Sequence, residues 1–217
     1  MTRDPKRIVA EGYDEIAQRY LAWSALAPSP ERMQHLARLC DLLPSEAEVL
    51  ELGCGAGVPI TQALAERWRV TGVDISREQI ALAERYAPDA TLICADMAAL
   101  DFAPGSFDAV VAFYALTHVP REEHAGLLHK IAGWLRPGGL LFATMGAGDS
   151  PDGVEPDWLG APMFFSHFDA DTNRRMVRRA GLDLIDAEIV AEDEDGKMVE
   201  FLWVVARKPA READSGD

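Results

Sequence analysis

The feature that most constrains the fold is a regular alternation of short apolar stretches with amphipathic helical stretches between residues 47 and 145. Five apolar stretches are expected as strands, over 47–52, 69–73, 90–94, 107–113 and 140–145. Helical periodicity occupies the intervening stretches 60–68, 76–86 and 122–135. Strands that alternate with helices are joined by right-handed crossovers, so the pattern predicts an α/β fold whose mostly parallel sheet carries helices on both faces.

The two ends of the chain depart from this alternation. Residues 184–190 and 198–206 are expected as two final strands, and Asp195-Gly196 between them is a hairpin signal, so this pair is predicted to be antiparallel. The first 44 residues have helical periodicity interrupted at Pro28-Ser29-Pro30. They are expected to form an N-terminal helical cap.

The remaining boundaries follow from composition. We expect the main domain to span 45–208 and to be followed by a polar tail, 209–217. Within the domain, 146–168 is rich in Gly, Asp and Pro but also carries large apolar side chains. It is expected as an irregular inserted segment that covers a substrate site.

Charge and cysteine content narrow the class of partner. The 217 residues include 21 Lys and Arg against 36 Asp and Glu, a net charge of −15, which disfavours a nucleic-acid partner. No apolar run reaches the roughly 18 residues of a membrane span, and no secretory signal is recognisable. Cys40, Cys54 and Cys94 lack the spacing of a disulfide framework or a zinc site. We therefore expect a cytoplasmic monomer or homodimer that holds no metal, contacts no membrane and acts on a small molecule.

A glycine-rich loop follows the first predicted strand. The run Glu51-Leu52-Gly53-Cys54-Gly55-Ala56-Gly57 joins that strand to a helix. Glycines let a backbone approach a ligand closely, and the helix N-terminus behind them favours negative charge. A tight strand-to-helix turn that binds nothing is the simpler alternative.

Two acidic residues end the next two predicted strands. Asp74 lies 21 residues after Gly53, where a carboxylate can accept both hydroxyl hydrogens of a ribose. Asp96 ends the third strand, and a helix cap or a solvated loop acid is its alternative role. Because the carboxyl ends of parallel strands share one edge, the loop and both acids are predicted to form one ligand site.

These motifs give the chain a recognisable family resemblance. It resembles class I S-adenosylmethionine (SAM)-dependent methyltransferases of the small type 11/12 kind. The resemblance rests on VLELGCGAG (49–57), VTGVDIS (70–76), CADMAALDFAPGSFDAVVAFYALTHV (94–119) and LRPGGLLFATM (135–145). It implies a Rossmann-like sheet of seven strands with an antiparallel last strand, SAM as cofactor, and methyl transfer to an O or N atom, or to S or C, of a small metabolite.

The resemblance also implies roles for individual residues. Glu51, Gly53, Gly55 and Gly57 would surround the methionine part of SAM, with Phe113 nearby. Asp74 would hold the ribose. The adenine would lie among the remaining three residues, Ile75, Asp96 and Met97.

Aromatic residues outside these motifs are candidates for the lid and the acceptor pocket. Tyr13 and Tyr20 are seven residues apart on one helical face and could close over SAM, with core packing as the alternative. The residues predicted to line the acceptor pocket are Tyr13, Trp23, Tyr114, Trp158, Met163 and Phe164. A buried cluster beneath a long loop is the alternative for the aromatic residues of 158–168.

Two histidines are candidate general bases. His167 lies among Phe164, Phe165 and Phe168, which are expected to exclude water and lower its pKa, so that it accepts a proton. His118 follows the fourth strand and is expected either to contact the substrate or to be structural. The other three, His35, His124 and His129, lie on amphipathic helices and are expected at the surface.

Two other functions share parts of this pattern. An NAD-dependent oxidoreductase also uses a glycine loop and a strand-end acid, but Glu51 beside a pyrophosphate would be repelled, whereas beside a methionine ammonium it would be attracted. A non-catalytic SAM-binding module fits all the motifs, because they report cofactor binding and not turnover.

Overall fold

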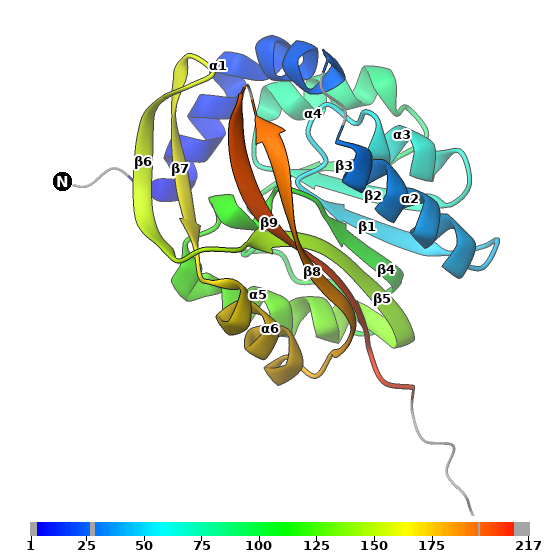
Figure 1. Ribbon diagram of the computed structural model, residues 1–217. Coiled ribbons are helices and arrows are strands. Elements are labelled where there is room, and N and C mark those ends of the chain that lie inside the picture. Colours follow the sequence, from blue (N-terminus) through cyan, green and yellow to red (C-terminus); the bar gives the residue numbers. More distant parts are fainter. Residues whose placement is uncertain (1–3, 27–28, 195, 211–217) are drawn as a thin grey trace, which may run out of the picture.

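A seven-stranded sheet with the strand order β3-β2-β1-β4-β5-β9-β8 forms the centre of the molecule (Figure 1). The computed structural model describes residues 4–26, 29–194 and 196–210. The strands are β1 (Glu48–Leu52), β2 (Arg69–Asp74), β3 (Thr91–Cys94), β4 (Phe107–Ala112), β5 (Leu135–Gly146), β8 (Asp183–Glu194) and β9 (Lys197–Arg207). Strands β1 to β5 pair in parallel, whereas β9 is antiparallel to both β5 and β8. The predicted fold class and its antiparallel last strand are confirmed.

Helices cover both faces of this sheet, because its central strands are apolar on both sides. On one face, α5 (Arg121–Trp134) and α6 (Ala170–Arg179) pack against β1, β4, β5 and β9. On the other, α2 (Pro30–Leu42) and α3 (Ile60–Ala65) pack over the same strands. The helix α4 (Arg77–Tyr86) follows β2, and a short 3-10 turn, η1 (Leu116–His118), follows β4.

The first helix lies across the carboxyl edge of the sheet. Helix α1 (Pro5–Leu26) packs Ile8, Val9 and Ile16 against the segment that follows β5. Helix α2 instead contributes Leu36 and Leu39 to the core over one sheet face. The two N-terminal helices therefore take different positions, and treating residues 1–44 as one cap remains a proposal. Of the predicted polar tail, residues 211–217 lie outside the described residues.

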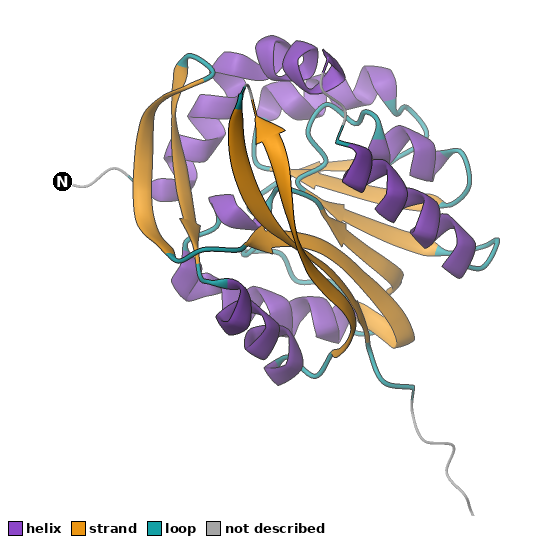
Figure 2. Cartoon of the chain, viewed as in Figure 1, coloured by secondary structure: helices purple, strands orange, loops and turns teal. Residues whose placement is uncertain are grey.

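The sequence predicts an irregular segment over 146–168, but most of this segment is regular β structure. It forms a hairpin of β6 (Ser150–Trp158) and β7 (Ala161–His167), a separate two-stranded sheet (Figure 2). Its two-residue turn has positive φ at both Leu159 and Gly160, the backbone of a type I′ turn. The prediction failed because β6 is mostly exposed and contains turn-forming residues, so its pairing with β7 and not its own residue preference makes it a strand.

Candidate functional site

The glycine loop lies where β1 ends and is held against its neighbours. The backbone N–H groups of Gly53 and Cys54 both donate to the carbonyl of Val73, at 2.7 and 2.9 Å. Gly53 has a φ of +77°, and a Cβ at this position would collide with the Cβ of Ala115 after β4. The conformation and the close approach of these two loops both require glycine here.

Asp74 connects the end of β2 to this loop. Its carboxylate accepts hydrogen bonds from the backbone N–H of Gly55 and from that of Ser76, each at 2.9 Å. Burial raises the pKa of Asp74 to about 6, although these hydrogen bonds oppose the shift. Asp74 therefore braces the glycine loop, and it lies at the sheet edge where its predicted ribose role would place it.

Glu51, one residue before the end of β1, is a buried carboxyl group. Thr61 Oγ1 donates to it at 2.7 Å. Burial raises its pKa to about 8, while the Thr61 hydrogen bond and the charge of Arg32 act in the opposite direction. A cation beside Glu51 would lower this pKa and so favour the ionised carboxylate.

A small cavity of about 40 Å³ lies between the glycine loop and the N-terminal helices. It contains one acid, Glu51, and one base, Arg32 of α2. The other lining residues are Tyr20, Leu21, Ser24, Gly53, Cys54, Gly55, Ala56, Val58, Ile60 and Phe113. Three of the four residues expected around the methionine part of SAM, Glu51, Gly53 and Gly55, line this polar chamber together with Tyr20 and Phe113. The fourth, Gly57, belongs to the same loop but does not line the chamber.

The residues expected around the adenine are spread more widely. Asp96 accepts from Lys6 Nζ at 2.7 Å and from the backbone N–H of Ala98 at 2.9 Å. Lys6 also binds Glu123, at 2.6 Å, so Asp96 joins α1 to the rest of the domain. Ile75 packs with the α1 cluster, whereas Met97 packs with the core beneath α5. Their adenine roles remain predictions.

A second, larger cavity of about 850 Å³ opens beside the small one. Its lining residues come from α1, the start of α2, the β6–β7 hairpin, the η1 turn, the end of β8 and the start of β9. Trp158 is central to its aromatic wall, with ring centroids 5.6 Å from Tyr13, 5.8 Å from Tyr20 and 6.3 Å from Trp23. Tyr114, His118, Phe165 and His167 also line it.

Two predicted pocket residues lie elsewhere. Met163 is fully buried and Phe164 nearly so, in the cluster that joins the hairpin to α1. Phe165 lines the cavity and Phe164 does not, because successive side chains along β7 point to opposite faces. Met163 and Phe164 thus pack in this buried cluster and not along the wall of the larger cavity.

Tyr13 and His118 form an oriented pair in the larger cavity. The Tyr13 hydroxyl lies 2.9 Å from His118 Nε2, and His118 Nδ1 lies 2.9 Å from the carbonyl oxygen of Phe164. A carbonyl can only accept, so Nδ1 carries the proton and Nε2 accepts from Tyr13. Burial lowers the pKa of His118 to about 4, which keeps the ring neutral. The same burial raises the pKa of Tyr13 well above 10.

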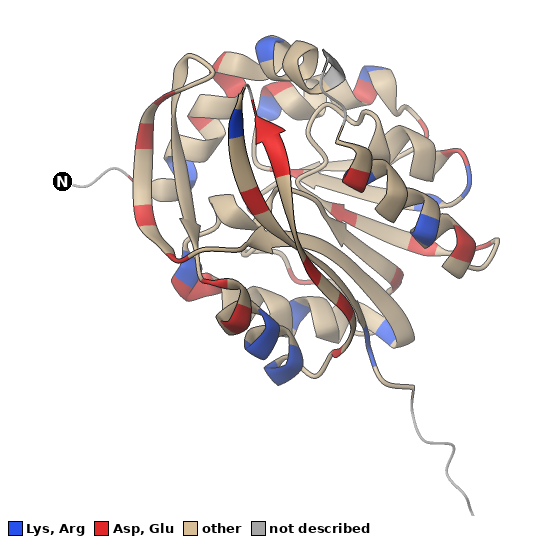
Figure 3. Cartoon of the chain, viewed as in Figure 1, with Lys and Arg blue, Asp and Glu red and all other residues tan. Residues whose placement is uncertain are grey.

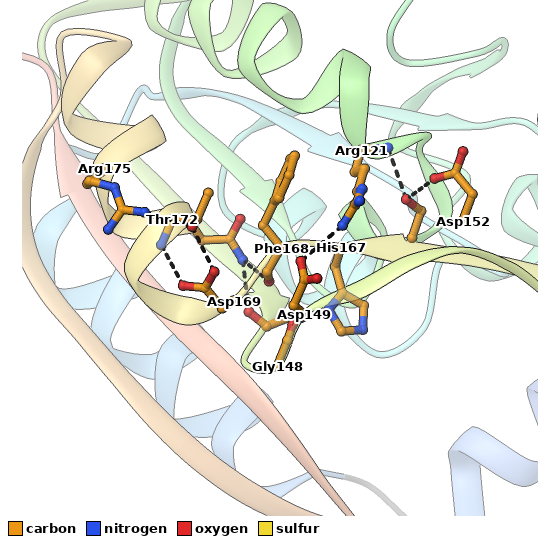
Figure 4. Close-up of polar contacts among 12 residues, drawn as sticks. Arg121, Gly148, Asp149, Asp152, His167, Phe168, Asp169, Thr172 and Arg175 are labelled. Atoms are coloured by element: carbon orange, nitrogen blue, oxygen red, sulfur yellow. Dashed lines mark hydrogen bonds and ion pairs between the residues drawn. The ribbon is translucent and has the colours of Figure 1, made fainter.

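His167 has different surroundings from those predicted (Figure 4). Its Nδ1 donates to the carbonyl of Gly148 at 2.7 Å, and the ring is only partly buried at the base of the hairpin. Phe168 packs beneath the Arg121 guanidinium, whose carbon lies 4.9 Å from that ring, and Arg121 also pairs with Asp149 at 2.9 Å. The expected dry aromatic enclosure surrounds His118 and not His167.

Two further histidines were expected at the surface but are not exposed. His124 is buried and its Nε2 donates to Val119 O at 2.9 Å. His35 stacks on Trp203 with ring centroids 4.4 Å apart. Both face inward because their helices pack on the sheet.

Two residues of the site were missed from the sequence. Arg32 is one of two arginines on the amphipathic helix α2, and nothing in its sequence neighbourhood marks it as different from a surface arginine. Glu192 accepts from Tyr114 at 2.6 Å and from Trp203 Nε1 at 3.0 Å, although it belongs to an acidic stretch typical of an exposed turn. Neither position has a local signal that could have found it.

The described part of the chain contains no group of three or more His, Cys, Asp or Glu side chains placed to hold a metal ion. Among the described helices, none combines the length and apolar character needed to cross a bilayer.

Comparison with known proteins assigns the stretch that carries the glycine loop. Residues 49–139 match the family model for a methyltransferase domain. This stretch is therefore similar to methyltransferase domains. A trans-aconitate 2-methyltransferase of Streptomyces avermitilis is 38% identical over 128 residues, which are 54% of this chain and 45% of that protein. The aligned stretch thus spans about half the length of the first curated relatives.

Solved structures support the same fold. The Burkholderia thailandensis 1,6-didemethyltoxoflavin N1-methyltransferase, solved with its substrate and S-adenosylhomocysteine, superposes with a TM-score of 0.65 at 21% identity, covering 93% of this chain and 91% of that one. A chain named as a cyclase, SpnF, superposes with the same TM-score of 0.65 at 18% identity, covering 82% of this chain and 80% of that one. This fold is therefore shared by proteins that are named for different reactions.

Proposed function

We propose that this protein transfers the methyl group of SAM to an oxygen or nitrogen atom of a small, partly apolar molecule. The observation that carries the proposal is the position of the aromatic-walled 850 Å³ cavity, which shares Tyr20, Ser24 and Arg32 with the polar chamber at the glycine loop. A cofactor in the chamber and an acceptor in the cavity would meet at this boundary. Such adjacency is what an in-line group transfer needs.

The residues of the chamber fit SAM. Glu51 provides a buried carboxyl group that becomes ionised beside an ammonium, and Arg32 provides a cation for a carboxylate. Asp74 at the same edge suits a ribose. When bound, SAM supplies a methyl group on a sulfonium, which is already activated for displacement. The protein has to position the acceptor and keep water out.

Tyr13 and His118 are suited to handle the proton of the acceptor. His118 is neutral, and its Nε2 lone pair is oriented by the hydrogen bond from Nδ1 to Phe164 O. An acceptor hydroxyl or ammonium that displaces or engages the Tyr13 hydroxyl can lose its proton toward Nε2. The surrounding rings of Trp158, Phe165 and Tyr20 limit access of water.

His167 remains an alternative base. It lines the same cavity, but its partly exposed ring lies at the rim. The pair Tyr13 and His118 is better suited, since the His118 ring is buried and its Nε2 already contacts a hydroxyl. We therefore assign the proton transfer to this pair.

The charge around the cavity bears on the acceptor. Acidic residues lie along β6 and at the carboxyl end of β8, and both of these segments line the cavity (Figure 3). A polyanion would be repelled, which supports a neutral or cationic small molecule and argues against nucleic acid. The tricarboxylate named in a relative is a poor fit to this wall, whereas transfer to a ring nitrogen or a hydroxyl is compatible with it.

A second candidate is a SAM-binding protein that catalyses another reaction or none. The structural similarity to a cyclase supports this alternative, because the fold alone does not determine that the reaction is methyl transfer. An NAD-dependent oxidoreductase is disfavoured, because the chamber places Glu51 where a pyrophosphate would lie.

A screen with methyl-labelled SAM tests the proposal. Phenols, alcohols, amines, imidazoles and thiols would be offered, with label transfer to product as the readout and Asp74→Ala as the negative control. Transfer to at least one oxygen or nitrogen nucleophile is expected. Tight SAM binding without transfer to any class would favour the non-methylating alternative.

A further inference from the structure

Arg32 stands out in the site because it is a cation without a complete set of partners. Its Nε is buried and has no hydrogen-bond partner among the described residues. The guanidinium carbon lies 4.5 Å from the centre of the Tyr114 ring, and the Tyr20 hydroxyl is within hydrogen-bonding reach. A buried guanidinium nitrogen without a hydrogen-bond partner is costly, so this arrangement is suited to a ligand that brings an anion.

The position of Arg32 is fixed from both ends. Its backbone N–H donates to Ser29 Oγ at 3.2 Å, the N-cap bond that starts α2. Tyr114, which carries the guanidinium on its face, donates from its hydroxyl to Glu192 at 2.6 Å and shares a 2.8 Å hydrogen bond with Ser29 Oγ. The guanidinium is thus directed by a network that joins α2, the end of β4 and β8.

We propose that Arg32 binds the carboxylate of the methionine end of SAM, so that helix α2 takes part in holding the cofactor. This inference rests on the proposed function. The methionine end carries an ammonium and a carboxylate, and the small chamber contains one acid, Glu51, and one base, Arg32. The chamber is therefore complementary to a zwitterion. Burial raises the pKa of Glu51 to about 8, and an ammonium beside it would favour the ionised carboxylate.

The alternative that Arg32 binds an anionic acceptor is disfavoured by the larger cavity. Its wall contains six acidic side chains against two basic ones, Arg32 and Lys197. An anionic acceptor would have to approach past these acids, whereas the methionine carboxylate would reach Arg32 from the chamber. An ion pair is stronger where solvent is excluded, so the enclosed chamber is also the better place for a carboxylate to bind Arg32.

Binding of two cofactor fragments tests the inference without any acceptor. Isothermal titration would compare S-adenosylhomocysteine with 5′-methylthioadenosine, which lacks the amino-acid end. Arg32→Met is expected to weaken S-adenosylhomocysteine about 10- to 100-fold, the range for loss of a hydrogen bond to a charged group, and to change 5′-methylthioadenosine less than about threefold. Arg38→Met is the matched control, because Arg38 lies on the same helix and pairs with Asp186 at 2.8 Å.

Arg32→Lys keeps the charge and is expected to recover part of the lost affinity, which separates the effect from misfolding of α2. Equal weakening of both ligands by Arg32→Met, or no weakening of S-adenosylhomocysteine, would overturn the inference while leaving the proposed function intact. A wild-type protein that binds neither ligand would overturn the proposed function and the inference together.

Discussion

The hydroxyl of Tyr13 lies 2.9 Å from Nε2 of His118, which joins the first helix to the turn after β4. The two rings meet edge to face, with centroids 5.3 Å apart. The carbonyl of Phe164 fixes the tautomer from the other side. A phenol, an imidazole and a backbone carbonyl from three separate elements thus form one directed chain of hydrogen bonds.

The first prediction concerns turnover in variants of this pair. His118→Gln is expected to lower kcat about 10²–10⁴-fold on an acceptor that must lose a proton, the usual cost of removing a general base. Tyr13→Phe should lower kcat in the same direction, because it removes the hydroxyl that contacts Nε2. Affinity for S-adenosylhomocysteine should change little in both variants.

His167→Gln is the matched comparison, since this residue lines the same cavity from its rim. If His167→Gln lost as much turnover as His118→Gln, the base would have to be reassigned. The pH profile gives a second readout. With a His118 pKa of about 4, kcat at saturating SAM should stay level as pH falls through 6.5 and decline only near pH 4 to 5.

The second prediction concerns the pH dependence of stability. The pKa of Glu51 rises from 4.5 to about 8 on folding, so between these values the folded chain binds more protons than the unfolded chain. This contribution to stability is fully present below pH 4.5 and is lost as pH rises through about 8. Asp74 acts in the same direction, between 3.8 and about 6.

His118 has the opposite effect. Its pKa falls from 6.5 to about 4, so its contribution is lost as pH falls through that window. Thermal unfolding of the ligand-free protein should therefore show a decrease in Tm from pH 6.5 to 8, which Glu51→Gln removes. An unchanged slope in Glu51→Gln would show that Glu51 titrates normally.

The fold could be predicted from the sequence because its signals are local. Short apolar strands and intervening helices recur over residues 47–145, and Gly53 and Asp74 mark the sheet edge by their spacing alone. The hairpin of β6 and β7 could not be predicted, because a mostly exposed strand is stabilised by its partner. Arg32, His118 and Tyr13 come together only through packing of α1 and α2, and no local pattern encodes a contact over 105 residues.

The third prediction concerns Asp74. Asp74→Ala should weaken S-adenosylhomocysteine by about 1–3 kcal/mol, because ribose hydroxyls lose their acceptor. The same change leaves the N–H groups of Gly55 and Ser76 without a partner, so Tm should fall as well. Asp74→Asn keeps one acceptor oxygen and should lose less of both. Calorimetry and thermal unfolding would be measured on the same samples. Full affinity in Asp74→Ala would remove Asp74 from the cofactor site.

The last prediction concerns Trp158 at the end of the hairpin. Its ring contacts Tyr13, Tyr20, Trp23 and Phe165, with centroids between 5.6 and 6.3 Å away. Trp158→Ala should raise the KM of an apolar acceptor about tenfold or more, because a buried aromatic contact surface contributes roughly 1.5–3 kcal/mol. Affinity for S-adenosylhomocysteine should change less than about twofold, since Trp158 lines the larger cavity and not the chamber. Trp134→Phe, in the core beneath the sheet, is a control for general loosening of the fold. A loss of cofactor affinity in Trp158→Ala as large as the rise in acceptor KM would place the hairpin over the cofactor and require the acceptor to enter elsewhere.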